Sequence, residues 1–178
     1  MLLAPFNTYN IQAAEMKTLE YDKSVMTQIN SSYSYMEKKV RNAAVKVATD
    51  RGHGSGTLVR YKDIALVITA HHVANGSLGQ DYLILTESEQ LMGVLIYTDP
   101  LNDIAVIYPV GEFKYAKPMK WRTADTIGQV GEDITYSGYP SWHSLLSFRG
   151  QIAGYELLPN KGQQIILQTY GYYGSSGS

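Results

Sequence analysis

Residues 64–73 read IALVITAHHV, a run of apolar and β-branched residues that ends in two adjacent histidines. A run of this kind, free of glycine and proline, predicts a buried β-strand. The strand would carry His71 and His72 at its end. Since a histidine at a strand end is most often a hydrogen-bonded structural residue, the role of this pair depends on the chain around it.

More short strands are predicted on both sides of this run. They cover residues 44–48, 57–59, 82–85, 93–97, 104–107, 134–136, 151–153 and 164–167. Glycines and the pairs Asn-Gly, Asp-Pro and Tyr-Pro separate them, and no helical pattern lies between them. Many short strands at regular intervals favour an all-β barrel or sandwich fold. Residues 111–121, with one proline and three lysines, are the least strand-like interval and the candidate linker between two halves.

The N-terminal part of the chain has a different pattern. Residues 11–40 contain neither glycine nor proline, which favours a helix. Steps of three and four would place one set of apolar residues on a single helical face: Leu19, Met26, Ile29, Tyr33, Met36 and Val40. Such a stripe serves either to dock on a partner or to pack against its own domain. Its short length favours packing against its own domain.

Composition limits the classes of function. Fifteen basic and 16 acidic residues give a net charge of −1, so no long-range field would attract nucleic acid or an anionic membrane. With no cysteine, the chain has no disulfide, no thiolate metal ligand and no cysteine nucleophile. Residues 1–6 lack a basic segment and contain Pro5, so they do not form a secretory signal, and no apolar run approaches the ~20 residues of a membrane helix. We expect a soluble protein.

Two further polar patterns accompany the histidines. Asp103 stands directly before the apolar run 104–107, and the chain ends in Gly-Ser-Ser-Gly-Ser at residues 174–178. Taken alone, an aspartate before a strand is usually turn chemistry, and a glycine-serine terminus is usually flexible. Their order along the chain gives them more weight than either pattern has by itself.

These segments resemble the chymotrypsin-like serine protease superfamily, in particular its cysteine-free high-temperature-requirement branch and its viral members. The resemblance runs from about residue 43 to residue 178. Residues 69–73 (TAHHV) are similar to the T-A-A-H-C/V signature, residues 103–106 (DIAV) to D-I/L-A-L/V, and residues 174–178 to G-x-S-G-G/S. Lesser similarities lie in GSGTLV (54–59), SGYP (137–140), RGQI (149–152) and QT (168–169).

The resemblance implies a catalytic triad of His72, Asp103 and Ser176. The backbone N–H groups of Gly174 and Ser176 would form the oxyanion hole, and neither metal nor cofactor would be needed. The chain order His, Asp, Ser is the one that chymotrypsin-like proteins use, and the intervals of 31 and 73 residues suit two barrels that meet at the site. Tyr170 is a weak candidate for the floor of the substrate pocket. No acidic residue lies between residues 162 and 178, so selection of Lys or Arg is not expected.

The remaining histidines are assigned as follows. His71 stands where the family has a small residue, and strand alternation lets only one of the two neighbours face the cleft. Val73, at the position where the family has Cys or Val, favours His72 as the base. His53 and His143 match no motif and are expected at the surface.

The sequence therefore predicts an all-β, chymotrypsin-like double β-barrel with an N-terminal helical extension. The expected parts are residues 1–42 (helical extension), 43–112 (first barrel), 113–119 (linker) and 120–178 (second barrel). Because only two residues follow Ser176, the second barrel is expected to be incomplete.

The expected function is a serine endopeptidase that acts on protein or peptide substrates, with a processing or maturation role and a virus-encoded protease as one case. Its expected location is the cytoplasm or a virion. The alternative is a protease-like structural or interaction module with a vestigial site. In either case the N-terminal helix is a candidate surface for assembly or self-association.

Overall fold

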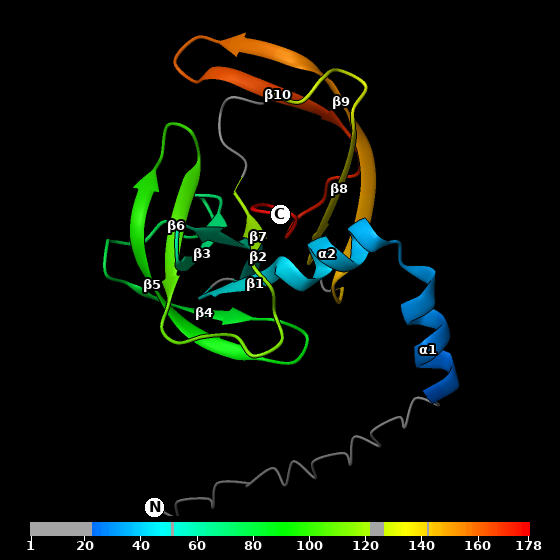
Figure 1. The fold of residues 1–178 in the computed structure, drawn as a ribbon. Helices are drawn as coiled ribbons and strands as arrows, with labels where there is room; N and C mark the ends of the chain where they lie inside the picture. The colour runs from blue at the N-terminus through cyan, green and yellow to red at the C-terminus, as the bar shows by residue number, and fades with distance from the viewer. Residues whose placement is uncertain (1–22, 51, 122–126, 142) are drawn as a thin grey trace, which may run out of the picture. The chain divides into compact units, whose positions relative to one another are not determined.

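The computed structural model describes residues 23–50, 52–121, 127–141 and 143–178. The chain divides into two units, Met1–Ser32 and Tyr33–Ser178. Helix α1 (Lys23–Ser32) belongs to the first unit, and helix α2 (Tyr35–Ala43) and all the strands belong to the second (Figure 1). The strands are β1 (Ala44–Thr49), β2 (Gly52–Tyr61), β3 (Ile64–Thr69), β4 (Asp81–Leu85), β5 (Gln90–Asp99), β6 (Ile104–Pro109), β7 (Met119–Lys120), β8 (Asp133–Gly138), β9 (Leu146–Leu158) and β10 (Gly162–Gln168).

The first sheet is a closed antiparallel barrel of six strands. Its order is β1-β4-β5-β6-β3-β2, and the pairing of β1 with β2 closes it. The short strand β7 adds to β2 in parallel. A second, antiparallel sheet has the order β10-β9-β8. The predicted fold class, mostly β with a closed barrel and an N-terminal helix, is confirmed.

The barrel core consists of inward-facing aliphatic side chains. The largest of those that are almost free of solvent are Val45, Val47, Leu58, Val67, Ile84, Leu95 and Ile107. Alternate residues along these strands face outward, as the period of two requires. Gly93 lets the backbone of β5 pack closely against this core, because a Cβ built there would lie 2.5 Å from the Ile84 side chain and 2.6 Å from the Ile107 side chain.

Gly52, Gly54 and Gly56 are among the glycines expected to separate strands, because they lie between the predicted strands 44–48 and 57–59, but they are part of β2. A Cβ at Gly54 would lie 2.4 Å from Val73, and one at Gly56 would lie 2.9 Å from Val67. Glycine at these positions therefore serves close packing inside a strand. Strand β7 lies at the end of the interval predicted as a linker, where its pairing with β2 gives it a strand conformation that its own sequence does not favour. The domain boundaries themselves stay a prediction.

The prediction of one continuous N-terminal helix is wrong over the described residues. Helix α1 ends at Ser32 and helix α2 begins at Tyr35, so residues 33 and 34 are not helical. Ser34 is the N-cap of α2: its hydroxyl accepts from the Glu37 N–H, and the Glu37 carboxylate accepts from the Ser34 N–H. This capping box has the sequence signature Ser-x-x-Glu, which the apolar periodicity masked. Leu19 and residues 11–22 lie outside the described residues.

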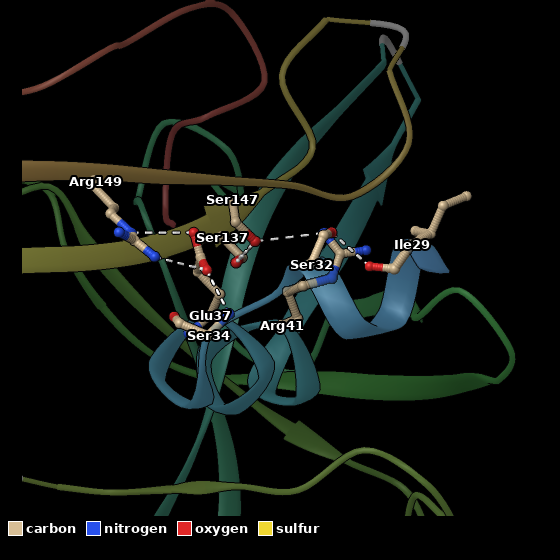
Figure 2. A network of polar contacts seen from close by, with 8 residues as sticks. All are labelled: Ile29, Ser32, Ser34, Glu37, Arg41, Ser137, Ser147 and Arg149. Atoms are coloured by element: carbon tan, nitrogen blue, oxygen red, sulfur yellow. Dashed lines mark hydrogen bonds and ion pairs between the residues drawn. The ribbon is translucent and has the colours of Figure 1, made fainter. Parts of the chain in front are cut away.

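Two arginines fix helix α2 to the rest of its unit. Arg149 of β9 binds the Glu37 carboxylate through Nε at 3.1 Å and Nη2 at 2.9 Å (Figure 2). Arg41 donates to the Leu145 carbonyl at 2.8 Å and pairs with Glu87, in the turn between β4 and β5, at 3.2 Å. Packing of this helix against its own domain is therefore confirmed for α2, while self-association through the N-terminal region stays a prediction.

The helices of the described residues are short. None of them combines the length and the apolar character that crossing a lipid bilayer requires.

Leu95 and its neighbour Ile96 test the barrel core, because Leu95 is 1% exposed and Ile96 is 47% exposed. Leu95→Ala leaves a cavity in a packed interior and should lower the free energy of unfolding by about 2–5 kcal/mol. Ile96→Ala should change it by less than ~0.5 kcal/mol. Urea titration of both variants measures the difference, and equal losses would contradict the barrel assignment.

Glu37 gives the fold a dependence on pH. Hydrogen bonds from the Ser34 N–H and then from Arg149 lower its pKa from 4.5 to about 2. Because the folded pKa is depressed, the stability that this carboxylate contributes is complete above pH 4.5 and is lost as the pH falls toward 2. Glu37→Gln should therefore melt below the wild type at pH 7, and the gap should close on acidification. Glu156→Gln, an exposed carboxylate of β9, is the control and should show no gap.

Candidate active site

His72 and Asp103 are joined by two hydrogen bonds. The His72 backbone N–H donates to Asp103 Oδ1 at 2.9 Å, and the ring Nδ1 lies 2.7 Å from Oδ2. Both side chains are open to solvent, with 58% of His72 and 46% of Asp103 exposed. A carboxylate that holds Nδ1–H fixes the ring tautomer and leaves Nε2 free to accept a proton.

The turn between β5 and β6 sets the position of Asp103. The Asp99 carboxylate accepts from the backbone N–H groups of Leu101 and Asn102 at 3.1 and 3.0 Å, and Asn102 Nδ2 donates to it at 2.6 Å. Asp103 then takes φ of +56°, a left-handed conformation that Asp tolerates better than most residues. Its backbone carbonyl accepts from the His71 N–H at 3.0 Å. This backbone hydrogen bond holds the loop close to the end of β3, independently of the contact between the Asp103 side chain and His72.

The pKa of Asp103 is lowered from its ordinary value. Burial acts in the opposite direction, but the hydrogen bonds from the His72 backbone N–H and ring outweigh it. The charges of His72 and His71 add smaller contributions of the same sign. Asp103 therefore remains an anion well into the acid range, which suits a group that stabilises a neighbouring imidazolium.

The other histidines occupy different environments. The His71 ring has a buried Nδ1 with no hydrogen-bond partner among the described residues, so of the two neighbours it is His72 whose ring meets Asp103. His143 is exposed, as predicted. The surface assignment of His53 is wrong: it is half-buried on β2, and its Nε2 lies 2.9 Å from the Tyr139 carbonyl.

The loop that carries Ser176 is packed on the first barrel. The Ser55 N–H of β2 donates to the Ser176 carbonyl at 2.8 Å. Gly177, with φ of +86°, lies so close that a Cβ there would be 2.2 Å from the Ser55 carbonyl oxygen and 3.0 Å from the Ala70 nitrogen. Gly177, the neighbour of Ser176, therefore contacts Ala70, which lies just after β3 and two residues before His72.

The hydrogen bonds of the described residues do not include one between the His72 ring and the Ser176 hydroxyl. Such bonds are often long in free enzymes and tighten when substrate binds. The structure thus pairs His72 with Asp103 and places the Ser176 loop against Ala70, two residues before His72.

Gly174 and Ser176 each present a backbone N–H that donates to no other described residue. The N–H of Ser175, between them, donates to the Tyr172 carbonyl at 2.9 Å. Gly174 has φ of +85°, and a Cβ there would lie 2.5 Å from the Tyr139 carbonyl oxygen, so this position requires glycine. Two unused donors, one on Ser176 itself and one two residues before it, can bind an oxyanion.

Tyr170 lies in a row of stacked aromatic rings. Its ring stacks on Phe148 at 5.0 Å and on Tyr172 at 6.3 Å between centroids, and Phe148 stacks on Tyr136 at 5.2 Å. The Tyr136 hydroxyl also donates to the Tyr170 carbonyl. Tyr170 is 52% exposed, so its role in selecting substrate stays a prediction.

A cavity of about 570 Å³ borders His72 on the side of the first barrel. Val73 and Tyr82 are buried residues of its lining, and Asp50 and Asp81 are acidic ones. Within the part of the chain that the structure describes, no group of three or more His, Asp or Glu side chains is arranged to hold a metal ion.

Three residues that the sequence did not assign to the site connect its parts: His53, Ser55 and Tyr139. The Ser55 hydroxyl accepts from the Tyr139 N–H and donates to the Gly174 carbonyl. Burial raises the pKa of Tyr139 to about 12, so its phenol is neutral. The Gly-Ser-Gly and Gly-Tyr-Pro motifs marked Ser55 and Tyr139, but the motifs carry no information on which loop they contact.

Comparison with known proteins defines the class. A family model described as a trypsin-like peptidase domain matches residues 54–178, so the chain belongs to the trypsin-like peptidase family. A search of curated protein sequences found no match.

Solved structures with the same fold include two of Rv3671c, one of them described as from Mycobacterium tuberculosis H37Rv. The inactive form of Rv3671c with a serine-to-alanine substitution gives a TM-score of 0.64 at 17% identity, and the match covers 80% of the present chain and 70% of the Rv3671c chain. A second inactive form gives 0.63 at 18% identity, over 80% and 73%. Deg5 gives 0.62 at 19% identity, over 89% and 80%. At these identities the likeness concerns the fold.

Gly177 and Gly171 form a matched pair for testing the packing of the serine loop. A Cβ at Gly177 would collide with Ser55 and φ is positive there, whereas a Cβ at Gly171 meets nothing within 4 Å. Gly177→Ala should displace the loop and lower peptidase activity by about 10²-fold, as small misplacements at a reacting centre do. Gly171→Ala should keep wild-type activity. Equal activity of the two variants in a peptide-cleavage assay would contradict the placement of the loop.

Proposed function

We propose that this protein is a serine endopeptidase with His72, Asp103 and Ser176 as its triad. The observation that carries the proposal is the pair of hydrogen bonds that the Asp103 carboxylate accepts from the backbone N–H and the ring of His72. A histidine held in this way, with a serine loop packed beside the end of its strand, supports nucleophilic catalysis by serine.

The reaction proceeds in two halves. His72 Nε2 takes the Ser176 hydroxyl proton as Oγ attacks the peptide carbonyl, and the same proton then passes to the leaving amine. This leaves an acyl-enzyme ester. A water molecule attacks the ester, His72 takes the proton of that water, and the return of the proton to Ser176 Oγ releases the new carboxyl end.

Two features of the site lower the energy of the tetrahedral intermediates. The backbone N–H groups of Gly174 and Ser176 are the donors to the oxyanion, and loss of one such donor typically costs ~10²–10³-fold in rate. Asp103 stabilises the imidazolium that forms on His72, and its lowered pKa keeps it charged for this purpose.

The substrates of this reaction are proteins or peptides. The cavity beside His72 offers space for part of the chain next to the cleaved bond. The resemblance to the high-temperature-requirement and viral branches supports a processing or maturation role, of which a virus-encoded protease is one case. The competing function, a structural module with a vestigial site, predicts no serine-dependent chemistry.

A fluorophosphonate probe tests this function directly. The wild type should be labelled at Ser176, and Ser176→Ala and His72→Ala should lose the label. Asp103→Asn should lower kcat by about 10⁴-fold, because the wrong ring tautomer is then favoured.

The adjacent Ser175 provides the control, since its hydroxyl is buried and has no partner among the described residues. Ser175→Ala should still be labelled. Absence of label in the wild type, or label that persists in Ser176→Ala, would contradict the assignment of the nucleophile.

A further inference from the structure

We propose that the Ser55 hydroxyl is a positioning group for the oxyanion hole, an inference that rests on the serine endopeptidase function proposed above. Ser55 lies on β2 in the first barrel and is fully buried, with 0% of its surface exposed. It belongs to neither the triad nor the oxyanion donors. Its contacts nevertheless reach the loop that provides both donors.

The hydrogen-bond directions at Ser55 are fixed by its neighbours. Its Oγ lies 2.8 Å from the Tyr139 nitrogen, which has a proton and can only donate. Its single hydroxyl proton is therefore free to go to the Gly174 carbonyl oxygen, 2.6 Å away. The backbone N–H of the same residue donates to the Ser176 carbonyl at 2.8 Å. Ser55 thus holds two carbonyls of the serine loop.

Two further carbonyls of the loop are also bound. The carbonyls of Tyr173 and Ser175 accept from the N–H groups of Ser141 at 2.5 Å and Ser178 at 2.9 Å. In a planar trans peptide the C=O and N–H point in opposite directions. The Gly174 N–H therefore points away from the Tyr173 carbonyl that Ser141 binds, and the Ser176 N–H points away from the Ser175 carbonyl that Ser178 binds.

The peptide unit between Gly174 and Ser175 separates the two oxyanion donors. Its carbonyl is held by Ser55 Oγ, and its N–H is held by the Tyr172 carbonyl at 2.9 Å. Without the Ser55 hydroxyl this unit keeps only one of its two anchors, and a glycine with φ of +85° has the freedom to rotate. Rotation would misalign the donors on either side, which act only when they point at the same oxygen.

Ser55→Ala should therefore lower kcat by about 10-fold or more and leave KM within about threefold. A transition-state effect should also appear in binding, because affinity for a peptide boronate that forms the tetrahedral adduct should fall in parallel with kcat/KM. Affinity for the product peptide should not change. Rates are expressed per active site titrated with a fluorophosphonate, so that loss of folded protein does not count as loss of kcat.

Ser137→Ala is the matched control. Ser137 is also a buried serine, 4% exposed, and its Oγ makes a 2.9 Å bond to Ser147 in the second sheet. Both variants remove one buried hydroxyl, so their melting temperatures should fall by similar amounts. Only Ser55→Ala should lose kcat. If Ser55→Ala does not fold, Ser55→Cys, which has a similar shape and only a weak donor, should show the same loss of kcat at unchanged KM.

The outcomes separate the two proposals. If the wild type cleaves peptides in a Ser176-dependent manner and Ser55→Ala retains the kcat of Ser137→Ala, the positioning role of Ser55 is overturned while the protease function stands. A rise in the KM of Ser55→Ala with unchanged kcat would also overturn the positioning role of Ser55. If the wild type has no Ser176-dependent cleavage, the protease function is overturned, and the positioning role falls with it.

Discussion

A buried serine on the first barrel holds the backbone of a loop that lies more than a hundred residues further along the chain. Ser55 donates to the carbonyls of Gly174 and Ser176, accepts from Tyr139, and has its own carbonyl bound by the Thr69 hydroxyl at 2.7 Å. The polar groups of Ser55 and Thr69 cannot turn to water instead, because Ser55 is fully buried and Thr69 is 3% exposed. Leaving one such group unpaired costs about 1–3 kcal/mol, so the loop has few alternatives to this position.

Shared hydrogen bonds also fix other contacts between segments of the chain. Asp103 is positioned by a turn that the Asp99 carboxylate closes, and it binds His72 through both the backbone and the ring. The Glu37 carboxylate accepts both from the Ser34 backbone N–H at the start of helix α2 and from the Arg149 guanidinium. In each case one carboxylate satisfies a backbone N–H and a side chain together, which fixes orientation as well as distance. Side chains from segments far apart in the sequence can meet in a defined geometry because local hydrogen bonds fix each segment.

Much of this arrangement could be predicted from local pattern. The continuous apolar, β-branched runs 64–69 and 104–107 predict β3 and β6, and the resemblance of short motifs points to His72, Asp103 and Ser176. Apolar spacing alone predicts a helix through Ser34, where the capping signal interrupts it, and Gly54 and Gly56 favour a turn where β2 in fact continues. Neither His53 nor Ser55 was assigned a contact, since what they touch is set by tertiary packing of residues 139 and 174. Such contacts have no signature in the sequence near either partner.

Amide hydrogen exchange at Ser55 tests the central claim, that the first barrel holds the serine loop in place. The Ser55 N–H donates to the Ser176 carbonyl at 2.8 Å, so its protection reports the docking of the loop alone. We predict that in the wild-type protein this amide exchanges as slowly as that of Leu58, in the core of the same strand. Exchange of Ser55 at the rate of an exposed loop amide, while Leu58 stays protected, would contradict the account.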